Sequence, residues 1–428
     1  FKQKTAYEIM PSLVGSEMCI RDRGCKVNQY ETQAFKEGLL RRGFSIVDDE
    51  ASLYIINTCA VTEQAAIKSK KIIQKVKRKN SQAQVVVTGC MVEDYEKELK
   101  RMGVDLLIPH SQKHLLLEKI LGRENSSKNI WDLKITSFFN KRAYLKIQDG
   151  CDSFCSFCAI PYFRGKPLSR PVEDIIGEAE RLCKKHPEIV LCGINLALYG
   201  KEENFRNNLS LLIKRLLKIE DLKRLRLSSL QPVCLGEDFF SLFENGKMCP
   251  HLHLSFQSGD DKVLRLMNKK EDVSLYLNLV KKLRKLNPHI AISCDIMVGF
   301  PYEDERSFAN TVRFLKEVRP MRMHIFTFST RPHTIFENMK LKKSWMIRMK
   351  ERYSILKRLA EEFSYEYKRN FLGRTLFMVA EEKKDGYICG YTQNYIRVFV
   401  EKEIPLGEIV KVRLRSIDKD KVFADAEK

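Results

Sequence analysis

The chain has 428 residues, 13 cysteines and a formal net charge of +21, from 76 lysines and arginines against 55 acidic residues. Its length favours two or three domains over one, and its 44% hydrophobic content is sufficient for packed cores. No apolar run reaches the roughly eighteen residues of a membrane span. The odd cysteine count favours reduced or metal-bound thiols in a cytosol over a secreted disulfide framework, and the positive charge favours an anionic partner such as nucleic acid.

Residues 1–23 show no clear hydrophobic period, and the residues just before Gly24 are polar and charged. The segment lacks the charged, apolar and small-residue layout of a signal peptide. No strand is expected in it, although a loop at Gly24 ought to follow one. We therefore expect the segment to be foreign, for example translated adapter or assembly sequence that replaces the native start. Finding these codons in the resequenced locus would refute that expectation.

Strand and helix patterns alternate over residues 24–125 and predict a parallel α/β domain. Short apolar runs predict the strands, and the longer polar or basic runs between them predict the helices. The expected strands are Leu53–Asn57, Gln84–Thr88 and Val104–Ile108, and the expected helices are Gln29–Arg42, a helix that Thr62 caps and that runs to Lys79, and Asp94–Met102. The polar residues 126–141 are expected to form a linker.

Three cysteines of this domain stand at the ends of elements. Cys59 and Cys90 directly follow two expected strands, and Cys25 precedes the first helix. The carboxyl ends of parallel strands lie along one edge of a sheet, where ligands bind. A lone cysteine would be read as a small buried hydrophobe. Three cysteines at one edge of the predicted sheet favour a second three-thiolate site, which separate loops would build.

The basic run Lys68–Lys79 contains no acidic residue. Its lysines, among them Lys68, Lys71 and Lys75, are candidates for phosphate contacts with RNA. A solvated helix face opposite the isoleucines of the same run explains the pattern nearly as well.

Three further cysteines lie within eight residues of one another, in the stretch KIQDGCDSFCSFCAIPYFRG. Cys151, Cys155 and Cys158 form a C-x3-C-x2-C pattern. A loop of this length can bring three thiolates to one metal centre, and three thiols cannot pair off as disulfides. A structural zinc site would need a fourth ligand, which usually comes from a second nearby pair, and none follows. Three cysteines with one open position favour an iron–sulfur cluster that leaves one iron free for a ligand.

From residue 142 to 368 the alternation of strands and helices restarts and predicts a partial (β/α) barrel of the TIM type. The expected strands are Ala143–Ile147, Ile189–Cys192, Arg224–Leu227, Leu252–Ser255, Ala291–Val298 and Met323–Thr327. The expected helices include Val172–Lys185, Ser210–Leu217, Asp261–Met267 and Glu305–Val318, and a long charged helix over Ser344–Tyr367. The three-cysteine loop then follows the first barrel strand, on the face where such barrels bind their ligands.

Polar residues and glycines follow each later strand of this barrel, which favours a ligand-binding face over packing. A glycine permits close approach of a backbone, and an amide both donates and accepts hydrogen bonds. The candidate cofactor-binding residues are Gly193, Asn195, Ser229, Gln257, Ser258, Asp295 and Arg331.

Residues 369–428 change to a period of two and predict a small all-β barrel. Its expected strands are Arg374–Ala380, Gly386–Gly390, Tyr395–Val400, Ile409–Arg415 and Lys421–Ala426. The stretch Gly390–Tyr395 is expected to expose aromatic and amide groups to RNA, through Tyr391, Asn394 and Tyr395.

The three-cysteine loop with its flanks resembles the cluster loop of the radical S-adenosylmethionine (SAM) enzymes and, more narrowly, of the methylthiotransferases. The resemblance extends from Gly24 to Lys428 and covers an amino-terminal cluster domain, the barrel and a carboxy-terminal RNA-binding domain called TRAM. The sequence GCKVNQYET, from Gly24 to Thr32, resembles the bacterial members that modify N6-threonylcarbamoyladenosine beside the tRNA anticodon.

The resemblance implies two [4Fe–4S] clusters, one on the C-x3-C-x2-C loop and an auxiliary one on Cys25, Cys59 and Cys90. It also implies that SAM serves both as methyl donor and as radical source, and that C2 of the adenine receives the methylthio group. Besides the cluster ligands it implies no catalytic residue. The expected partners are tRNA, an electron-donor protein and a sulfur source, and the identities of the electron donor and the sulfur source are open. We expect a cytoplasmic monomer that has no contact with a membrane.

The sequence departs from the family pattern at several strand ends. Gln231 replaces a glutamate, Tyr302 and Asp304 replace a glycine and a threonine, His333 replaces a glycine, and Lys269–Glu271 replaces Arg-x-Tyr. Gln231 keeps the hydrogen bonding but loses a charge, and Tyr302 and His333 are expected to need altered loop conformations. None of these positions is a cluster ligand.

Two alternatives stay open at this point. One is methylthiolation of isopentenyladenosine in tRNA, or of a ribosomal protein. The other is a zinc-stabilised RNA-binding protein without catalysis.

Overall fold

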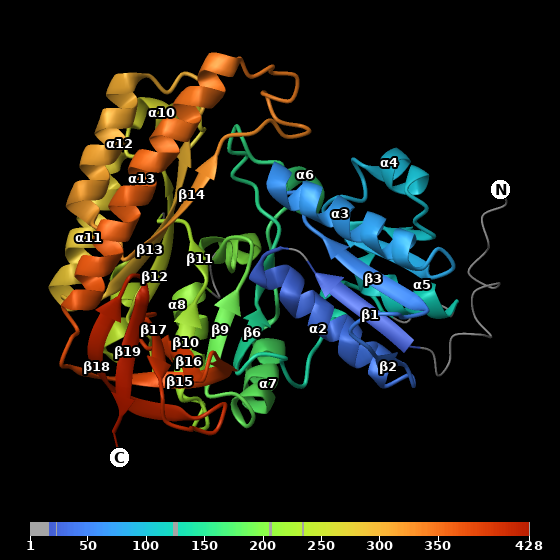
Figure 1. Ribbon diagram of the computed structural model, residues 1–428, viewed down its shortest axis with the longest axis horizontal. Coiled ribbons are helices and arrows are strands. Elements are labelled where there is room, and N and C mark those ends of the chain that lie inside the picture. The colour runs from blue at the N-terminus through green and yellow to red at the C-terminus, as the bar shows by residue number, and fades with distance from the viewer. Residues whose placement is uncertain (1–16, 23, 123–126, 205–207, 233–234, 428) are drawn as a thin grey trace.

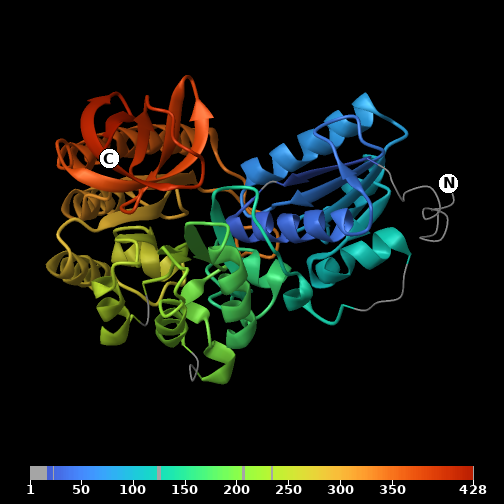
Figure 2. The same cartoon turned by 90° about the horizontal axis from the view of Figure 1, so that it is seen from below.

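The computed structural model describes residues 17–22, 24–122, 127–204, 208–232 and 235–427, and it divides into three parts (Figure 1). An amino-terminal α/β domain lies beside a central barrel of strands and helices, and a small β-barrel packs against the central one on another side (Figure 2). No helix within the described ranges combines the length and apolar character that a membrane crossing requires.

The amino-terminal domain is a five-stranded sheet in the order β2-β1-β3-β4-β5, with every neighbouring pair parallel. Its strands are β1 (Glu17–Asp22), β2 (Ser45–Ile46), β3 (Leu53–Thr58), β4 (Gln84–Gly89) and β5 (Leu106–Ile108). Its helices are α2 (Lys26–Leu40), α3 (Glu63–Lys79), α4 (Glu96–Arg101) and α5 (Leu116–Leu121), with the 3₁₀ turn His110–Leu115 before α5. The predicted parallel α/β domain is confirmed.

Strand β1 corrects one expectation, because a strand does precede Gly24. Residues Met18–Asp22 pair in register with Leu53–Asn57 of β3, and Met18 and Cys19 are buried. Only three apolar residues, Met-Cys-Ile, carry this strand between charged neighbours, so its local pattern is too short to be read as a central strand. Residues 1–16 and 23 lie outside the described part of the chain, and the foreign origin of segment 1–23 stays a prediction.

The central domain is an open barrel of parallel strands in chain order, with β6 and β14 at its two edges. One sheet has the order β10-β9-β6 and the next β11-β12-β13-β14, and only Ser228 separates β10 from β11. The strands are β6 (Arg142–Lys146), β9 (Glu188–Cys192), β10 (Arg224–Leu227), β11 (Ser229–Leu230), β12 (His251–Gln257), β13 (Ala291–Val298) and β14 (Arg322–Thr327). A short antiparallel pair, β7 (Gln148–Asp149) and β8 (Leu168–Ser169), stands beside it.

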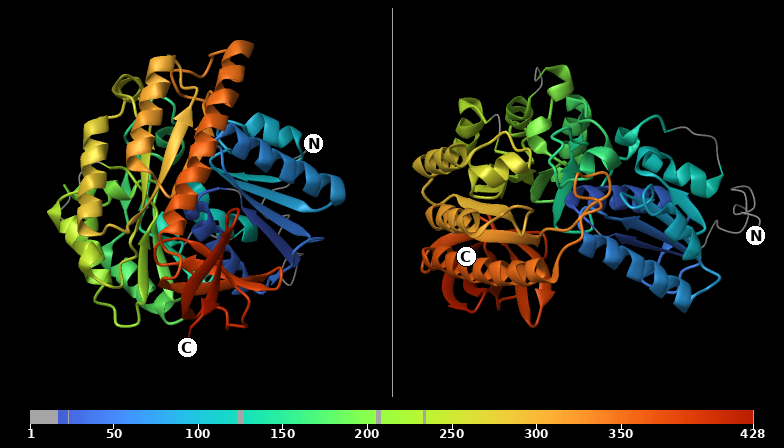
Figure 3. Two further views of the ribbon diagram at one scale, coloured as in Figure 1. Left: turned by 60° about the vertical axis from the view of Figure 1, so that its left-hand side comes forward. Right: turned by 90° about the horizontal axis from the view of Figure 1, so that it is seen from above.

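Helices cover the outside of this barrel (Figures 1 and 3). They are α7 (Val172–Cys183), α8 (Leu209–Leu216), α9 (Glu237–Phe240), α10 (Asp261–Leu266), α11 (Val273–Leu286), α12 (Glu305–Val318) and α13 (Lys343–Arg369). The short helix α6 (Ile160–Arg164) lies instead against the amino-terminal domain, where it contacts the 3₁₀ turn His110–Leu115. Short 3₁₀ turns occupy Ile130–Asp132, Leu196–Leu198, Lys201–Glu203 and Ser241–Glu244. Along α7, α8 and α12 the buried residues recur every three or four positions, so each helix turns an apolar face to the strands.

The carboxy-terminal domain is the predicted closed barrel, in the order β15-β16-β17-β19-β18. Its strands are β15 (Thr375–Lys384), β16 (Tyr387–Thr392), β17 (Arg397–Val400), β18 (Ile409–Asp418) and β19 (Lys421–Ala426). Only β17 and β19 pair in parallel; the other neighbours are antiparallel. That this barrel is a TRAM domain stays a prediction.

Helix α2 joins the amino-terminal domain to the central barrel. Its Tyr30 and Phe35 belong to the same buried apolar cluster as Leu145 of β6 and Ile189 of β9. The Tyr30 hydroxyl also contacts the Leu133 carbonyl (2.9 Å) and the Glu178 carboxylate (2.7 Å) of the central domain. The carboxyl edge of the first sheet is therefore fixed beside the mouth of the barrel.

Candidate active site

The loop with Cys151, Cys155 and Cys158 is held to the barrel through its backbone. Gly150 begins the loop with φ +69°, and a Cβ there would lie 2.0 Å from the Lys166 carbonyl oxygen, so only glycine fits. The Cys151 amide donates to the Gly165 carbonyl at 3.0 Å, and the Ser156 amide donates to the Met267 carbonyl at 3.1 Å. These bonds tie the loop to the segment after α6 and to the end of α10.

A cavity of about 150 Å³ lies under this loop at the carboxyl ends of the strands. Three of the predicted cofactor-binding residues, Asn195, Ser229 and Gln257, line it together with the three cysteines. The remaining polar residues of the lining are Ser153, Gln231, Ser255 and Lys269. The predicted arrangement, with thiols and hydrogen-bonding groups facing one space, is present in the structure.

The other predicted cofactor-binding residues lie outside this lining. Gly193 stands behind it, where a Cβ would come within 2.9 Å of Gln148. Ser258 is buried against Thr311, and Asp295 lies deeper in the barrel next to Ser255. Arg331 is buried and donates to Ser329, within the electrostatic reach of Cys59 in the other domain. Their cofactor roles stay predictions.

Two side chains that sequence reasoning missed support this cavity. The Gln148 side-chain oxygen accepts from the Asn195 amide at 2.9 Å, and its nitrogen donates to the Gly150 carbonyl at 2.8 Å. Lys269 was noted only as a departure, yet its ammonium group lines the cavity and lies 3.5 Å from the buried Glu271 carboxylate. Gln148 directly follows the predicted strand Ala143–Ile147, and this position could have identified it as a site residue from the sequence. Nothing local distinguishes Lys269 from surface lysines.

The three cysteines of this loop are half-buried, and burial suppresses the ionisation of the Cys155 and Cys158 thiols. Burial, followed by the proximity of Cys155, raises the pKa of Cys158 to about 12, and burial also raises the pKa of Cys155. A nucleophilic cysteine needs a lowered pKa. Thiols with raised pKa values become thiolates when a bound metal displaces the proton, so the site suits metal ligation over nucleophilic catalysis.

The second triplet gathers at the carboxyl edge of the amino-terminal sheet, as predicted. Cys59 follows β3 and Cys90 follows β4, strands whose ends pair at Thr58 and Gly89. A Cβ at Gly24, the neighbour of Cys25, would lie 3.1 Å from the Cys59 Cβ, so the Cys25 segment adjoins Cys59. Burial, then Cys90 and then Cys25, raises the pKa of Cys59 to about 12. The ligand role of these cysteines stays a prediction.

The donor set of each triplet bears on the choice between a cluster and a single zinc ion. A tetrahedral zinc ion with Zn–S bonds of about 2.3 Å holds its sulfur ligands about 3.8 Å apart. Among the described residues, the one group of three histidine, cysteine or acidic ligand atoms within 4.8 Å of one another is His253, Asp295 and His324. Neither cysteine triplet forms such a compact group in the described part of the chain, and a donor set of three thiols fits an iron–sulfur cluster with one open iron.

Arg164 connects the two triplets. Its guanidinium donates to Asp149, two residues before Cys151, at 2.9 and 3.0 Å, and to Asn28, three residues after Cys25, at 2.7 Å. Asn28 in turn donates to the Thr58 carbonyl, beside Cys59, at 3.1 Å. The guanidinium is buried, and its charge acts on the thiols of the second triplet.

Of the predicted RNA-binding residues of the carboxy-terminal barrel, Asn394 is buried, whereas Tyr391 and Tyr395 are half-buried, and the RNA contact of the two tyrosines stays a prediction. Asn394 is 2% exposed and is bonded to Thr392 and Tyr367. Tyr395 stacks on His251 at 4.4 Å and on Tyr391 at 4.7 Å. The stretch Gly390–Tyr395 therefore closes the amino-terminal end of the central barrel, because stacking and cation–π contacts outweigh exposure of these rings.

Charged groups complete this closure. Tyr391 and Tyr395 lie under the guanidinium of Arg142 at 4.6 and 5.6 Å, and Tyr395 lies 4.8 Å from that of Arg226. The buried Glu188 carboxylate contacts Arg226 at 2.6 Å and Arg224 at 2.8 Å. The two barrels thus share one buried polar cluster.

The predicted lysines of α3 are exposed. Lys68, Lys71 and Lys75 recur every three or four residues along one face, and none has an ion-pair partner within the described ranges. Their neighbours Lys70 and Lys77 are instead paired with Glu98 and Asp105. The free stripe suits phosphate groups, and its RNA contact stays a prediction.

Tyr302 and His333, which stand where the family pattern has glycine, adopt a backbone conformation that glycine favours. Tyr302 and His333 have φ values of +67° and +63°, in the left-handed region that glycine favours. His333 is held there by Asp94 at 2.8 Å and by stacking on Tyr162 at 5.2 Å. Each residue therefore carries about 1 kcal/mol or more of backbone strain, and the expected change in loop conformation stays a prediction.

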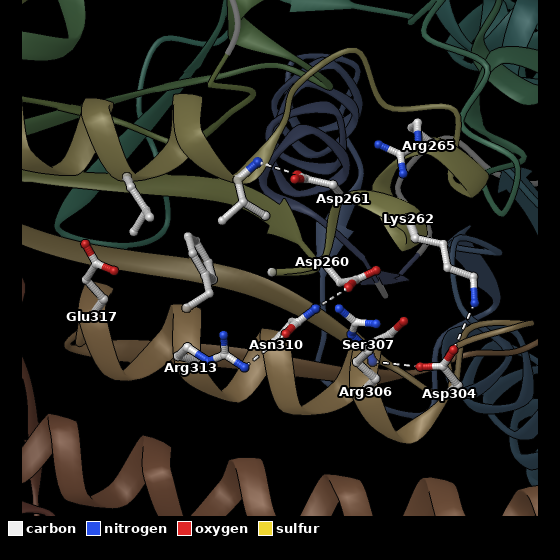
Figure 4. Close-up of a pocket in the computed structure, with 14 residues that line it drawn as sticks. Asp260, Asp261, Lys262, Arg265, Asp304, Arg306, Ser307, Asn310, Arg313 and Glu317 are labelled. Carbon is white, nitrogen blue, oxygen red and sulfur yellow. Dashed lines mark hydrogen bonds and ion pairs between the residues drawn. The ribbon is translucent and has the colours of Figure 1, made fainter.

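A larger hollow of about 570 Å³ lies outside the barrel between α10 and α12 (Figure 4). Lys262 pairs there with Asp304 at 2.9 Å, and Asn310 donates to Asp260 at 2.7 Å. Its lining carries four basic and four acidic side chains: Lys262, Arg265, Arg306 and Arg313 against Asp260, Asp261, Asp304 and Glu317. This balance favours neither anions nor cations, and no cysteine lines the hollow.

Comparisons with known proteins give the family. The model of the radical SAM superfamily matches residues 145–315, and that of "Uncharacterized protein family UPF0004" matches residues 17–108. The chain is 34% identical over 418 residues to threonylcarbamoyladenosine tRNA methylthiotransferase MtaB of Thermotoga maritima, covering 94% of this chain and 95% of that protein. It is 34% identical to MtaB of Bacillus subtilis, over 91% of this chain and 92% of that protein.

A relative with another substrate in its name is nearly as similar. The tRNA-2-methylthio-N(6)-dimethylallyladenosine synthase of Pelagibacter ubique is 31% identical, over 94% of this chain and 96% of that protein. Among solved structures, the radical SAM methyltransferase TsrM of Kitasatospora setae superimposes with a TM-score of 0.57 at 14% identity, covering 75% of this chain and 77% of that one, which supports the fold. The chain belongs to the tRNA methylthiotransferases of the radical SAM superfamily.

Proposed function

We propose that this enzyme converts N6-threonylcarbamoyladenosine in tRNA into its 2-methylthio derivative. The observation that carries the proposal is the similarity to MtaB proteins over nearly the whole of both chains. The two cysteine triplets at adjoining edges of two domains support it, because methylthiolation needs one centre for radical generation and a second for sulfur.

We assign two [4Fe–4S] clusters and SAM as the cofactors. Cys151, Cys155 and Cys158 hold one cluster, and Cys25, Cys59 and Cys90 hold the other. When bound, the first cluster leaves one iron open for SAM and supplies the electron for its reductive cleavage.

The protein's own groups bind and orient the ligand in the cavity. Ser229 and Ser255 share a hydrogen bond of 2.8 Å, and Asn195 donates to Gln231 at 2.7 Å, so the lining is preorganised. Lys269 supplies a positive charge beside the loop for an anionic group of the ligand. The apolar side chains of Phe157, Ile160 and Pro161 complete the lining and limit the access of water.

The substrate RNA meets the enzyme across more than one domain. Lys68, Lys71 and Lys75 of α3 bind its phosphates, and the outer surface of the carboxy-terminal barrel supplies further contacts. We further propose that the enzyme works in the cytoplasm as a monomer and takes electrons and sulfur from other components, whose identity is open.

Mass spectrometry of tRNA nucleosides tests the proposed function. A bacterial host that lacks its own enzymes for both modifications should gain the 2-methylthio derivative of threonylcarbamoyladenosine when it expresses this chain. A variant in which Cys151, Cys155 and Cys158 are alanine is the matched control and should give none. If the host gains only 2-methylthio-dimethylallyladenosine, the result would favour dimethylallyladenosine as the substrate, as the name of the Pelagibacter relative states. A colourless protein with stoichiometric zinc after anaerobic purification would favour an RNA-binding protein without catalysis.

A further inference from the structure

Two histidines and an aspartate come together inside the central barrel, on three neighbouring strands. Polar side chains alternate with core residues along β12, β13 and β14, so the polar ones share one face of the sheet. In the strand register His253 pairs with Ser293, and Asp295, two residues further along β13, pairs with His324. The register therefore places His253, Asp295 and His324 next to one another on this face.

The three side chains converge at their polar atoms. His253 Nε2 lies 3.0 Å from one oxygen of Asp295, and His324 Nδ1 lies 3.4 Å from the other. One ligand atom of each residue lies within 4.8 Å of the other two, and the part of the chain that the structure describes holds no second group of this kind. An ion with bonds of about 2.0–2.1 Å to nitrogen and oxygen holds tetrahedral ligand atoms about 3.3 Å apart, so the observed distances suit one ion.

Serine side chains hold the two inner members of this group in place. Ser293 Oγ lies 2.9 Å from His253 Nδ1. This contact can take the proton of Nδ1, which leaves Nε2 as a ligand atom. Ser255 donates to the Asp295 carboxylate at 3.2 Å. Such hydrogen bonds from an outer shell are the usual means by which proteins orient metal-binding histidines and carboxylates.

Exposure differs among the three residues in a way that suits a bound ion. The side chains of His253 and Asp295 are 13% and 16% exposed, whereas that of His324 is 43% exposed. The inner pair is thus shielded, and the outer imidazole gives an ion access from solvent. Three protein ligands leave the fourth position of a tetrahedral ion open, as in catalytic zinc sites. One carboxylate does not neutralise a divalent ion, so the open position suits water or an anionic oxygen ligand.

Direct hydrogen bonds within the group are the alternative to an ion. The His253 contact has the length of such a bond, but the 3.4 Å contact of His324 exceeds the usual 2.7–3.2 Å of an N–H···O bond. The ring centres of the two histidines are only 5.0 Å apart. Elsewhere in the chain, His333 and Asp94 form a direct contact of 2.8 Å, which makes this pair a suitable reference.

We propose that His253, Asp295 and His324 bind a divalent transition-metal ion, at a site separate from the two cysteine triplets. Two imidazoles and a carboxylate are a donor set that suits zinc or ferrous iron, whereas magnesium and calcium prefer oxygen ligands alone. Asp295 then serves as a metal ligand instead of a SAM-binding residue. The ion lies one hydrogen-bonded layer from the cluster cavity, because Ser255 both lines that cavity and donates to Asp295. The site does not depend on the function proposed above.

Zinc binding to the full chain, purified anaerobically with its iron and without a histidine tag, tests the site. Dialysis against zinc followed by elemental analysis should give about one zinc ion per chain with an unchanged iron content. X-ray absorption at the zinc edge should show nitrogen and oxygen ligands at about 2.0–2.1 Å and no sulfur at about 2.3 Å. The absence of sulfur separates this site from the cysteine triplets.

Single substitutions assign the zinc to the three residues. His324→Gln and Asp295→Asn should each weaken zinc binding by about a hundredfold or more, and Ser293→Ala, which removes only an outer-shell contact, by about tenfold to a hundredfold. His324 is exposed, so its replacement should leave the fold intact. His333→Gln is the matched control, because it removes an exposed histidine that also contacts a carboxylate, and it should leave zinc binding unchanged.

Four results would overturn the site. They are a chain that binds no zinc, bound zinc with sulfur ligands, natural affinity in the His324→Gln variant, and an equal loss of affinity in the His333→Gln control. The last result would indicate general binding of zinc at surface histidines. Zinc should also raise the melting temperature of the natural protein and not that of His324→Gln, which shows that each protein is folded when its zinc is counted.

Discussion

Replacement of Glu31 by glutamine should strongly destabilise the contact between the amino-terminal domain and the barrel. Glu31 lies on α2 with no exposed side-chain surface, and it accepts from Lys113 at 2.7 Å and from Lys146 at 2.8 Å. Lys146 and Arg164 also contact Asp149 and keep that partner. Lys113, equally buried, has Glu31 as its single acidic partner among the described residues. Glu31→Gln therefore leaves one buried ammonium group unpaired.

The expected cost follows from that unpaired charge. Removal of one partner of a buried ion pair costs about 3–5 kcal/mol of unfolding free energy, because the remaining charge stays out of water. Lys113→Met removes that charge and keeps most of the packing volume. The double variant Glu31→Gln with Lys113→Met should therefore recover about half or more of the loss, to within about 1–2 kcal/mol of the natural protein.

Urea unfolding followed by tryptophan fluorescence measures this cost. The chain has two tryptophans, and the Trp131 ring lies 5.3 Å from the Lys146 ammonium, so a Trp345→Phe background makes Trp131 the reporter of this contact. A loss below about 1 kcal/mol for Glu31→Gln would refute the reasoning. So would a double variant no more stable than Glu31→Gln alone.

The same carboxylate makes the contact sensitive to acid. Burial alone would raise the pKa of Glu31, but Lys113, Lys146 and Arg164 hold it well below its usual value. A pKa lower in the folded than in the unfolded state stabilises the protein above the unfolded value of about 4.3, and this stabilisation is lost as the pH falls. Glu31→Gln should therefore flatten the decline in the free energy of unfolding below about pH 5. If this decline is the same in the variant and the natural protein, Glu31 is not its cause.

Three further results are expected. Cys155→Ala should abolish SAM cleavage while tRNA binding persists, and retained cleavage would refute the cluster assignment. Alanine at Lys68, Lys71 and Lys75 should lower the slope of log affinity for tRNA against log salt by roughly two to three, whereas the same change at the ion-paired Lys70 and Lys77 of this helix should alter it less. Tyr395→Ala should expose the junction before the carboxy-terminal barrel to limited proteolysis, and Tyr395→Phe, which keeps the stacking on His251, should not.

The sequence predicts those parts of the fold and site that local pattern determines. The barrel strands are apolar runs between helical patterns, so their order and the loop after β6 follow from the chain alone. The edge shared by Cys59 and Cys90 follows as well, because parallel strands end on one side of a sheet. Both predictions depend on neighbours in sequence or on a general rule of topology.

Contacts between domains were not predictable in this way. Tyr391, Asn394 and Tyr395 form a motif that suits exposed RNA contacts, and only the packing of the two barrels places Tyr395 against His251. Pairing and burial across domains depend on the packed structure, and no periodicity in the chain records them.

The placement of the two cysteine triplets relative to each other is fixed by buried charge. Hydrogen bonds connect the segments that carry Cys25, Cys59 and Cys151 to the guanidinium of Arg164. Asn28 links the first two segments to it, and Asp149 links the third. Transfer of a group from one centre to a substrate activated at the other requires a fixed separation, because small displacements of reacting groups cost large factors in rate. The buried network of Glu31, Lys146, Asp149 and Arg164 gives the two centres a common rigid support, so its loss should impair methylthiolation even where both clusters are still bound.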